Sequence, residues 1–164
     1  MTGIPGKLCG WTLPQYKAKP RDKSMIIKKR PKPNPELHKL DRLVGIWNVS
    51  GEVCGQVSYS WMEGGFFLVQ YIDIEGSKGL EFIGYDEDSG TLKSHYFDGD
   101  GKVLEYNYDI TDTDHVITIN MPHIQGSFHG KYSNNGNTIT GRWCWKQGDE
   151  EMGYRAIFSR LNLS

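Results

Sequence analysis

Apolar and polar residues alternate with a period of two along most of the chain that follows Gly45. One run places apolar side chains at every second position and polar ones between them: Leu104, Tyr106, Tyr108 and Ile110 against Glu105, Asn107 and Asp109. This period is typical of β-strands with one buried face. The pattern predicts ten strands, at residues 45–53, 56–63, 66–75, 79–86, 91–97, 102–110, 115–121, 124–133, 137–146 and 151–161.

The connections between these strands are short and carry residues typical of hairpin turns. They include Gly64-Gly65, Ser89-Gly90, Asn135-Gly136 and the sequences DGDG, TDTD and QGD. Glycine and asparagine supply the positive φ that tight hairpins need. About ten strands without intervening helices predict an all-β fold, an antiparallel up-and-down barrel, because closure removes the exposed edges of an open sheet.

A single helix is predicted before the first strand, in the sequence NPELHKLDRLVG. Asn34 suits the N-cap, Pro35 suits the first helical position, and Glu36 favours the positive N-terminal end. Apolar residues recur every three or four positions, at Leu37, Leu40 and Leu43/Val44. We expect a short helix that plugs the barrel.

Charge divides the chain into two predicted parts, an extended basic arm (residues 1–34) and the barrel (residues 35–164). The arm carries nine Lys/Arg and one Asp, whereas the other 130 residues carry ten Lys/Arg and 19 Asp/Glu. Its prolines exclude a regular helix or a central strand. Because it also contains Trp11, Leu13 and Met25-Ile26-Ile27, we favour an arm docked on the acidic barrel as a candidate lid. A disordered tail and contact with an external polyanion are the alternatives.

Size and composition favour one soluble domain. The 164 residues suffice for one hydrophobic core. No apolar run reaches the roughly 18 residues of a membrane span, and residues 1–21 lack the apolar core of an export signal. Cys9, Cys54 and Cys144 are far apart in the sequence, so we expect reduced thiols and a cytoplasmic location.

No catalytic, metal-binding or cofactor-binding motif stands out. The five histidines are scattered, and we expect His115 and His123 to face solvent. The catalytic residues are unknown. His95 is the best candidate if the protein is an enzyme, because it shares the parity of Phe97 and would then point inward, although an inward histidine is more often a hydrogen-bonded core residue. The sequence therefore predicts no metal and no cofactor.

Two residues at the barrel ends carry a resemblance to a known group of proteins. The stretch VGIWNVSG contains Gly45-x-Trp47 at the start of the first predicted strand. It resembles the G-x-W signature of the calycins, which include the lipocalins and fatty-acid-binding proteins. The resemblance implies that Trp47 closes the barrel beneath an arginine of the last strand, at Arg160 or, as substitute, Arg155.

A narrower resemblance covers roughly residues 40–160. The stretches SYSWMEGGFFLVQYIDIEG and SHYFDGDGKVLEYNYDI, in this order after G-x-W, are similar to a bacterial domain family of unknown function with a lipocalin-like barrel. The chain is also similar in architecture to haem-binding calycins such as nitrobindin, without a histidine in an obvious matching C-terminal motif. The resemblance implies the fold and no agreed activity.

Aromatic residues are the remaining chemical signal, with five Trp, nine Tyr and six Phe. A barrel of this size either is filled by its side chains or holds one small ligand, and we favour a small hydrophobic or aromatic ligand. The expected ligand-binding residues are Trp61, Gln70, Tyr71, His95, Tyr106, Tyr108 and Trp143. Gln70 lies among large apolar residues, so we expect its amide to meet a buried Tyr hydroxyl, or a ligand or water.

Two other functions remain open. One is a cofactor-independent isomerase or cyclase on the same barrel, with His95 or a Tyr as its acid/base group. The other is a protein-interaction module that uses the basic arm. Nucleic acid is a disfavoured partner, and the oligomeric state is open, a homodimer included.

Overall fold

The structure is a computed structural model that describes residues 31–133 and 135–161. From Lys32 onward the chain belongs to one compact unit. The predictions for the basic arm, including its role as a lid, concern residues 1–34 and lie almost wholly outside the described residues.

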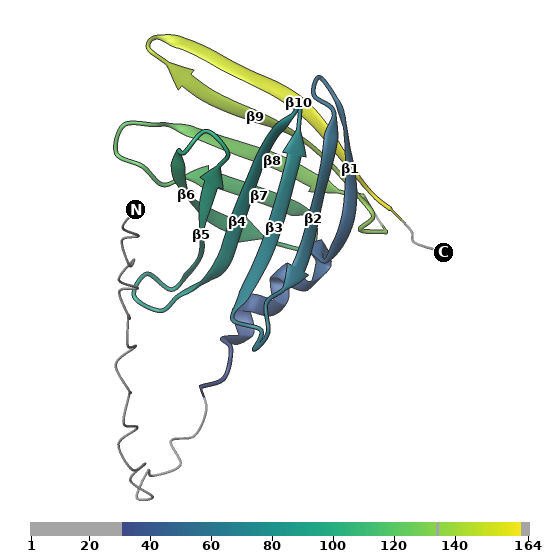
Figure 1. Cartoon of the computed structure of the whole chain (residues 1–164), viewed down its shortest axis with the longest axis vertical. Helices are drawn as coiled ribbons and strands as arrows, with labels where there is room; N and C mark the ends of the chain where they lie inside the picture. The colour runs from purple at the N-terminus through teal and green to yellow at the C-terminus, as the bar shows by residue number, and fades with distance from the viewer. Residues whose placement is uncertain (1–30, 134, 162–164) are drawn as a thin grey trace, which may run out of the picture. The chain divides into compact units, whose positions relative to one another are not determined.

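Ten antiparallel strands form a closed barrel, as the alternation predicted (Figure 1). Each strand pairs with its neighbours in sequence, and the last pairs with the first to close the barrel. The strands are β1 (Gly45–Gly51), β2 (Gly55–Trp61), β3 (Phe67–Ile74), β4 (Ser77–Asp86), β5 (Thr91–Asp98), β6 (Val103–Ile110), β7 (Asp114–Ile119), β8 (Gly126–Tyr132), β9 (Thr138–Gln147) and β10 (Glu150–Arg160). The predicted fold class, an all-β up-and-down barrel, is confirmed.

The predicted helix is present as a 3-10 helix, η1 (Pro35–Leu43). The Asn34 side chain accepts a hydrogen bond from the backbone N–H of Glu36 at 3.0 Å, so it caps the helix as expected. A 3-10 helix repeats every three residues, which aligns Leu37, Leu40 and Leu43 in one stripe. All three are buried, with 4%, 0% and 0% of their surface exposed. η1 therefore presents an apolar face to the barrel.

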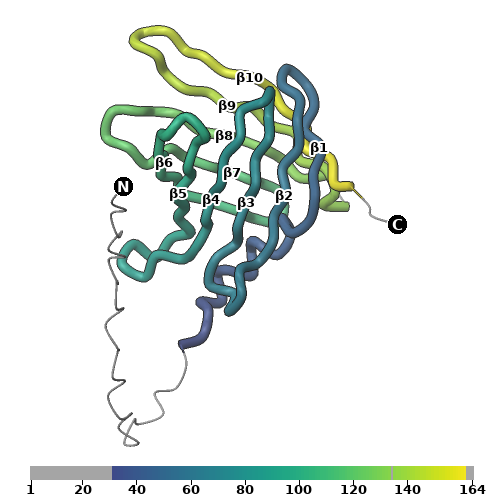
Figure 2. Tube along the Cα trace, viewed as in Figure 1, coloured from purple at the N-terminus to yellow at the C-terminus, as the bar shows by residue number. Residues whose placement is uncertain are grey.

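η1 lies at one end of the barrel, which we call the floor end (Figure 1). The β1–β2, β3–β4 and β9–β10 turns lie at the opposite end, which we call the mouth (Figure 2). The largest fully buried side chains are concentrated toward the floor end, on η1 and on the parts of the strands next to it: Leu40, Leu43, Trp47, Leu68 and Ile83. The packed core thus occupies one half of the barrel.

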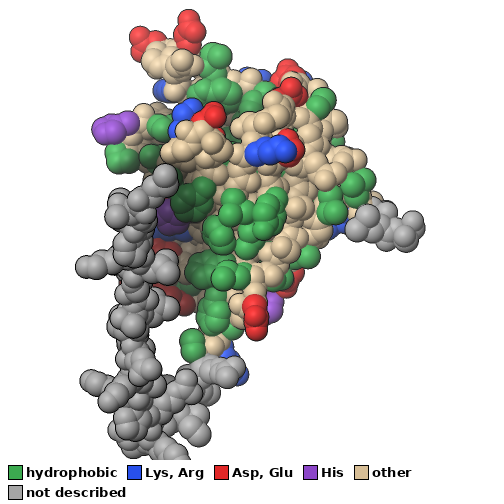
Figure 3. All heavy atoms as spheres, in the orientation of Figure 1, with side chains coloured by type: hydrophobic (Ala, Val, Ile, Leu, Met, Phe, Trp, Pro, Cys, Tyr) green, Lys and Arg blue, Asp and Glu red, His purple; other side chains and the backbone are tan. Residues whose placement is uncertain are grey.

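The outer face of β3, β4 and β5 carries apolar side chains as well. Phe67, Tyr71 and Phe97 are 46%, 58% and 44% exposed. Hydrophobic side chains gather on the face of the barrel shown in Figure 3. The Phe97 ring contacts Phe82 edge to face at a centroid distance of 6.3 Å. Both faces of β3 and β4 are therefore rich in apolar residues, which explains why alternation alone did not separate the inner from the outer face.

Candidate ligand-binding cavity

The mouth half of the barrel is hollow. A cavity of about 420 Å³ is lined by residues from nine of the ten strands, β2 to β10. Most of its lining is aliphatic or aromatic, and its polar groups are few. Small-molecule sites typically have this volume and this mixture, with an apolar wall and a few polar groups that orient the ligand.

A row of polar side chains crosses the cavity near the packed core. Tyr59 on β2 lies opposite Gln70 on β3, and Gln70 lies opposite Glu81 on β4. All three line the cavity, and Gln70 and Glu81 are only 6% and 3% exposed. Leu68 and Ile83, two residues closer to η1 on β3 and β4, are fully buried. The polar row therefore lies where the packed core ends and the cavity begins.

Glu81 is the central polar group of this row. The Tyr108 hydroxyl donates a hydrogen bond to Glu81 Oε1 at 2.7 Å. Burial in an apolar surrounding raises the pKa of Glu81 to about 7, and the hydrogen bond from the Tyr108 hydroxyl acts in the opposite direction. The carboxyl group therefore changes its charge near neutral pH inside the cavity.

His115 is the second buried titratable group of the lining. It is 2% exposed, and its Nδ1 shares a hydrogen bond with the Tyr132 hydroxyl at 2.9 Å. Burial, and then the charge of Arg42, lowers the pKa of His115 to about 3. The imidazole is neutral at physiological pH. The expectation that His115 faces solvent was wrong, because β7 turns this residue toward the interior.

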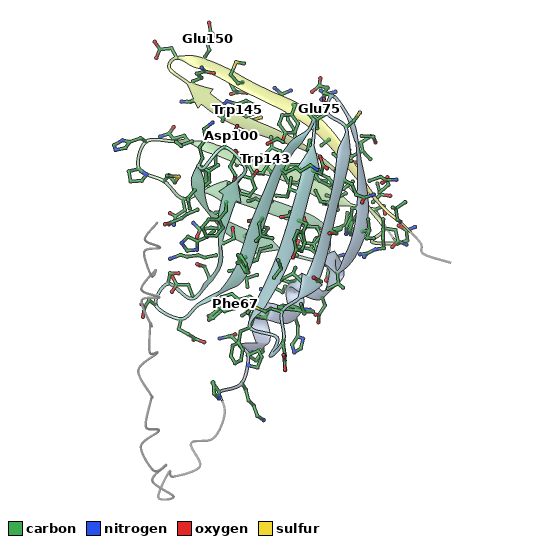
Figure 4. All side chains as sticks on the ribbon, in the orientation of Figure 1. Phe67, Glu75, Asp100, Trp143, Trp145 and Glu150 are labelled. Carbon is green, nitrogen blue, oxygen red and sulfur yellow. The ribbon has the colours of Figure 1, made fainter. Side chains whose placement is uncertain are left out.

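Aromatic rings form a continuous wall above the polar row. The Tyr106 ring contacts those of Tyr96 and Trp143, at centroid distances of 6.3 and 5.9 Å. Phe128 continues the wall, 5.6 Å from Trp143 and 5.7 Å from Phe158. Figure 4 shows Trp143 and Trp145 at the end of the barrel away from η1. These rings give the cavity a polarisable surface on β5, β6, β8, β9 and β10.

A glycine makes room for one of these rings. Gly79 on β4 lies opposite Asp98 on β5, next to Tyr96. A Cβ atom at Gly79 would lie 2.2 Å from the Tyr96 ring. The Tyr96 ring therefore occupies the space beside the Gly79 backbone that any side chain at residue 79 would fill.

Four of the residues expected to bind ligand line the cavity: Gln70, Tyr106, Tyr108 and Trp143. Gln70 borders the cavity and lies opposite Tyr59 on the adjacent strand, which is consistent with a tyrosine hydroxyl as its partner. The structure thus brings these four predicted residues together.

The other three expected residues do not line this cavity. Trp61 lies at the floor end, where its Nε1 donates to Asp41 Oδ1 at 2.8 Å. Tyr71 points outward and is 58% exposed. His95 is also on the outer face, with a half-exposed side chain 3.5 Å from Glu105. The inward orientation predicted for His95 was wrong, because Phe97, the residue whose strand parity His95 shares, lies on the outside of β5.

Trp47 and Arg160 meet at the floor end. The guanidinium carbon of Arg160 lies 4.2 Å from the centre of the Trp47 ring. Arg160 also donates to the backbone carbonyls of Arg42 and Val44, and Trp47 Nε1 donates to the Leu43 carbonyl at 2.8 Å. These contacts tie the end of η1 to β1 and β10, and they leave Arg155 without this role.

Within residues 31–133 and 135–161, no group of three His, Cys, Asp or Glu side chains is arranged to hold a metal ion. Cys54 and Cys144 are free thiols. No helix in this part of the chain has the length and apolar character that crossing a bilayer requires.

Among the cavity residues that sequence reasoning missed, Glu81 and His115 matter most, because both are buried and ionisable. Glu81 lies between Leu80 and Phe82, whose side chains point outward. A charged residue between two apolar neighbours is expected to face solvent while its neighbours face the core. The sequence pattern therefore favours an outward Glu81, the opposite of its orientation in the structure. The signal that could have found Glu81 is Gln70, its register partner on the adjacent strand.

Fold and cavity together define the class of the protein: a closed, antiparallel ten-stranded barrel, packed at one end and hollow at the other. Comparison with known proteins adds no narrower assignment, since no family model and no curated protein matches the chain.

Proposed function

We propose that the barrel binds a small molecule with a mainly apolar or aromatic skeleton in its cavity. The observation that carries this proposal is the cavity of about 420 Å³, lined by aliphatic and aromatic side chains around a few buried polar groups. A barrel that served only as a stable scaffold would gain free energy by filling this space, since each missing contact loses dispersion energy. The retained cavity therefore supports a ligand site.

An uncharged fluorescent probe tests this function directly. We expect N-phenyl-1-naphthylamine to bind in the cavity, quench the emission of Trp143 and Trp145, and gain emission by energy transfer. Ile72 and Tyr71 offer a matched pair of variants, because they are adjacent on β3 and only Ile72 lines the cavity. Ile72→Trp should fill the cavity and reduce probe binding at least about tenfold, the effect of losing about 1.4 kcal/mol of binding free energy.

The matched control is Tyr71→Trp, which adds a similar ring to the outer face. It should bind the probe as the unaltered protein does, because Tyr71 is 58% exposed. Equal probe affinity in both variants would place the probe outside the cavity and would contradict the proposal.

A second candidate function, a cofactor-independent isomerase or cyclase, is favoured by one observation. Glu81 is a buried carboxyl group at the cavity floor with a pKa of about 7, so it is suited to accept and return a proton near neutral pH. The acid/base candidate therefore moves from His95 to Glu81. Turnover of a bound compound that Glu81→Gln abolishes, with probe binding retained, would establish the enzyme.

We also propose a calycin-like family and a cytoplasmic location for the protein. The stacking of Arg160 on Trp47 supports the calycin-like interpretation of the G-x-W sequence. The free thiols of Cys54 and Cys144 fit a reducing, cytoplasmic environment. Cell fractionation of the native host would test the location.

A further inference from the structure

The cavity has an unusual charge distribution for an apolar site. Among the described residues, the lining contains two carboxyl groups, Glu75 near the mouth and Glu81 at the end of the cavity next to the packed core, and no Lys or Arg. His115 adds no positive charge, because its pKa is lowered to about 3. An ionised Glu81 therefore has no counter-charge within the lining.

The charges of Arg42 and Arg160 act on Tyr132, and that of Arg42 also on His115, but both side chains bind elsewhere. Arg42 donates to the backbone carbonyls of Thr111 and Asp112, and its guanidinium carbon lies 3.6 Å from the centre of the Tyr132 ring. Arg160 stacks on Trp47 and donates to two backbone carbonyls. Neither group is a partner for Glu81.

We propose that the cavity selects a small organic cation, an amine or quaternary ammonium on an apolar skeleton, whose charge pairs with Glu81 at the end of the cavity next to the packed core. This inference rests on the proposed function, since it names the ligand class of the same site.

The polar contacts of Glu81 favour a charged partner. The Tyr108 hydroxyl donates one hydrogen bond to Glu81 Oε1, and an ionised carboxylate can accept several further hydrogen bonds. The charge of Glu81 contributes to the raised pKa of Tyr59, Tyr96 and Tyr106, which places all three phenols within its electrostatic reach. A cation bound here would neutralise the buried charge, which is costly when it has no partner.

The aromatic wall favours the same ligand. Tyr96, Tyr106 and Trp143 form a chain of rings beside the carboxyl group. Ring faces attract a cation within about 6 Å, by roughly 0.5–2 kcal/mol for each contact. A carboxylate ligand, in contrast, would meet two acidic side chains and no basic one. The cavity should therefore rank ligands in the order cation, neutral molecule, anion.

The other titratable groups of the cavity lining do not obscure the ionisation of Glu81. They are phenols on β2, β5, β6 and β10 and one imidazole on β7: Tyr59, Tyr96, Tyr106, Tyr108, Tyr154 and His115. The pKa of each phenol is raised above its ordinary value by burial, and that of His115 is lowered to about 3. Glu81 changes its charge between pH 5 and 8, whereas these phenols and the imidazole do not. Glu75, on the β3–β4 turn, is the other acid of the lining.

Two probes of nearly equal shape separate charge from size. Benzyltrimethylammonium carries a permanent positive charge at every pH, and neopentylbenzene replaces its nitrogen by carbon. We would titrate both into the full chain at pH 5 and pH 8 by calorimetry. With a Glu81 pKa of about 7, the ionised fraction rises from about 1% to about 90% over this range. The affinity for the cation should therefore rise by up to about 90-fold, the ratio of the two ionised fractions, and that for neopentylbenzene should stay constant.

A matched pair of variants assigns the effect to Glu81. Glu81→Gln keeps the shape and should remove both the pH dependence and the preference for the cation. Glu75→Gln removes the other acidic side chain of the lining. Its amide oxygen can still accept the hydrogen bond that Glu75 Oε1 receives from the Cys54 N–H at 2.6 Å, so this variant should keep the preference. If Glu81→Gln does not fold, the unaltered protein still tests the inference, since binding of the cation at pH 6 should release about one proton.

Each outcome has a distinct meaning. A cation that binds tighter than neopentylbenzene at pH 8, with the pH dependence above, supports the inference. If neopentylbenzene binds as tightly as the cation or tighter, the inference is overturned and the proposed function stands. If neither compound binds and N-phenyl-1-naphthylamine also fails to bind, both are overturned.

Discussion

The two halves of the barrel are built from the same ten strands and differ in what fills them. At the floor end, η1 inserts its leucine stripe, and Trp47, Leu68 and Ile83 are 1%, 0% and 0% exposed. At the mouth end, the strands surround a cavity of about 420 Å³. The difference indicates a division of roles, in which the packed half stabilises the fold and the hollow half is available to a ligand.

The boundary between the halves explains how the hollow half persists. Polar groups at this level have partners of their own: Glu81 with Tyr108, and His115 with Tyr132. Buried polar groups that are hydrogen-bonded resist collapse onto an apolar core, because losing the partner costs about 1–3 kcal/mol. The polar row thus separates the packed core from the cavity and also gives the cavity its chemical character.

The largest expected effect comes from removing a side chain of the packed half. Leu40 of η1 is fully buried, so Leu40→Ala should lower the free energy of unfolding by about 2–5 kcal/mol through lost burial and a new cavity. Urea denaturation followed by tryptophan fluorescence measures it. The adjacent Lys39, which is half exposed, provides the control, since Lys39→Ala should change stability by less than about 0.5 kcal/mol. Equal effects at both positions would show that Leu40 is not part of a packed core, and the packed half would lose its support.

The next effect concerns the boundary and depends on pH. The pKa of Glu81 is raised from 4.5 to about 7 in the folded state, so the unfolded chain loses this proton first as the pH rises. Ionisation of Glu81 therefore destabilises the fold progressively from about pH 4.5 to 7, by about 3 kcal/mol in full. Glu81→Gln should be more stable than the unaltered protein by up to this amount at pH 8, and should lose the advantage near pH 4. Urea denaturation at both pH values measures the difference.

The titration of His115 does not disturb this comparison. Its pKa is lowered from 6.5 to about 3 in the folded state, so its contribution to stability is lost as the pH falls from about 6.5 to 3. This loss affects the unaltered protein and Glu81→Gln alike and cancels between them. A stability difference that is the same at pH 4 and pH 8 would show that Glu81 is not buried as described.

The fold could be predicted from the sequence because its local signals agree. Alternation marked the strands, and the turns between them contain residues that the backbone requires, such as Gly64 and Gly65 with φ of 97° and 72°. The N-cap at Asn34 and the leucine spacing marked η1. Each of these signals lies within a few neighbouring residues, so no knowledge of the tertiary structure was needed.

The cavity could be predicted only in part, because its residues depend on which face of each strand is inside. On β6 and β9 the outer face is polar, and Tyr106, Tyr108 and Trp143 were assigned correctly. On β3 and β4 the outer face is apolar too, and on β5 it carries Phe97, so Tyr71 and His95 were misplaced and Glu81 was missed. Only the pairing across strands, which brings Glu81 beside Gln70, resolves this ambiguity.

The smallest expected effect tests the hollow half on a single strand. Ile72 and Leu68 lie on the same face of β3, but Ile72 borders the cavity and Leu68 is fully buried in the packed core. Ile72→Ala removes a side chain that has no packing partner on its cavity side, so it should cost about 1 kcal/mol or less. Leu68→Ala should cost about 2–5 kcal/mol, as a core truncation does. Urea denaturation of both variants measures the difference, and Ile72→Ala should also retain the neutral probe. A cost for Ile72→Ala as large as that for Leu68→Ala would mean that the cavity is filled by side chains in solution, and the division between a packed and a hollow half would no longer hold.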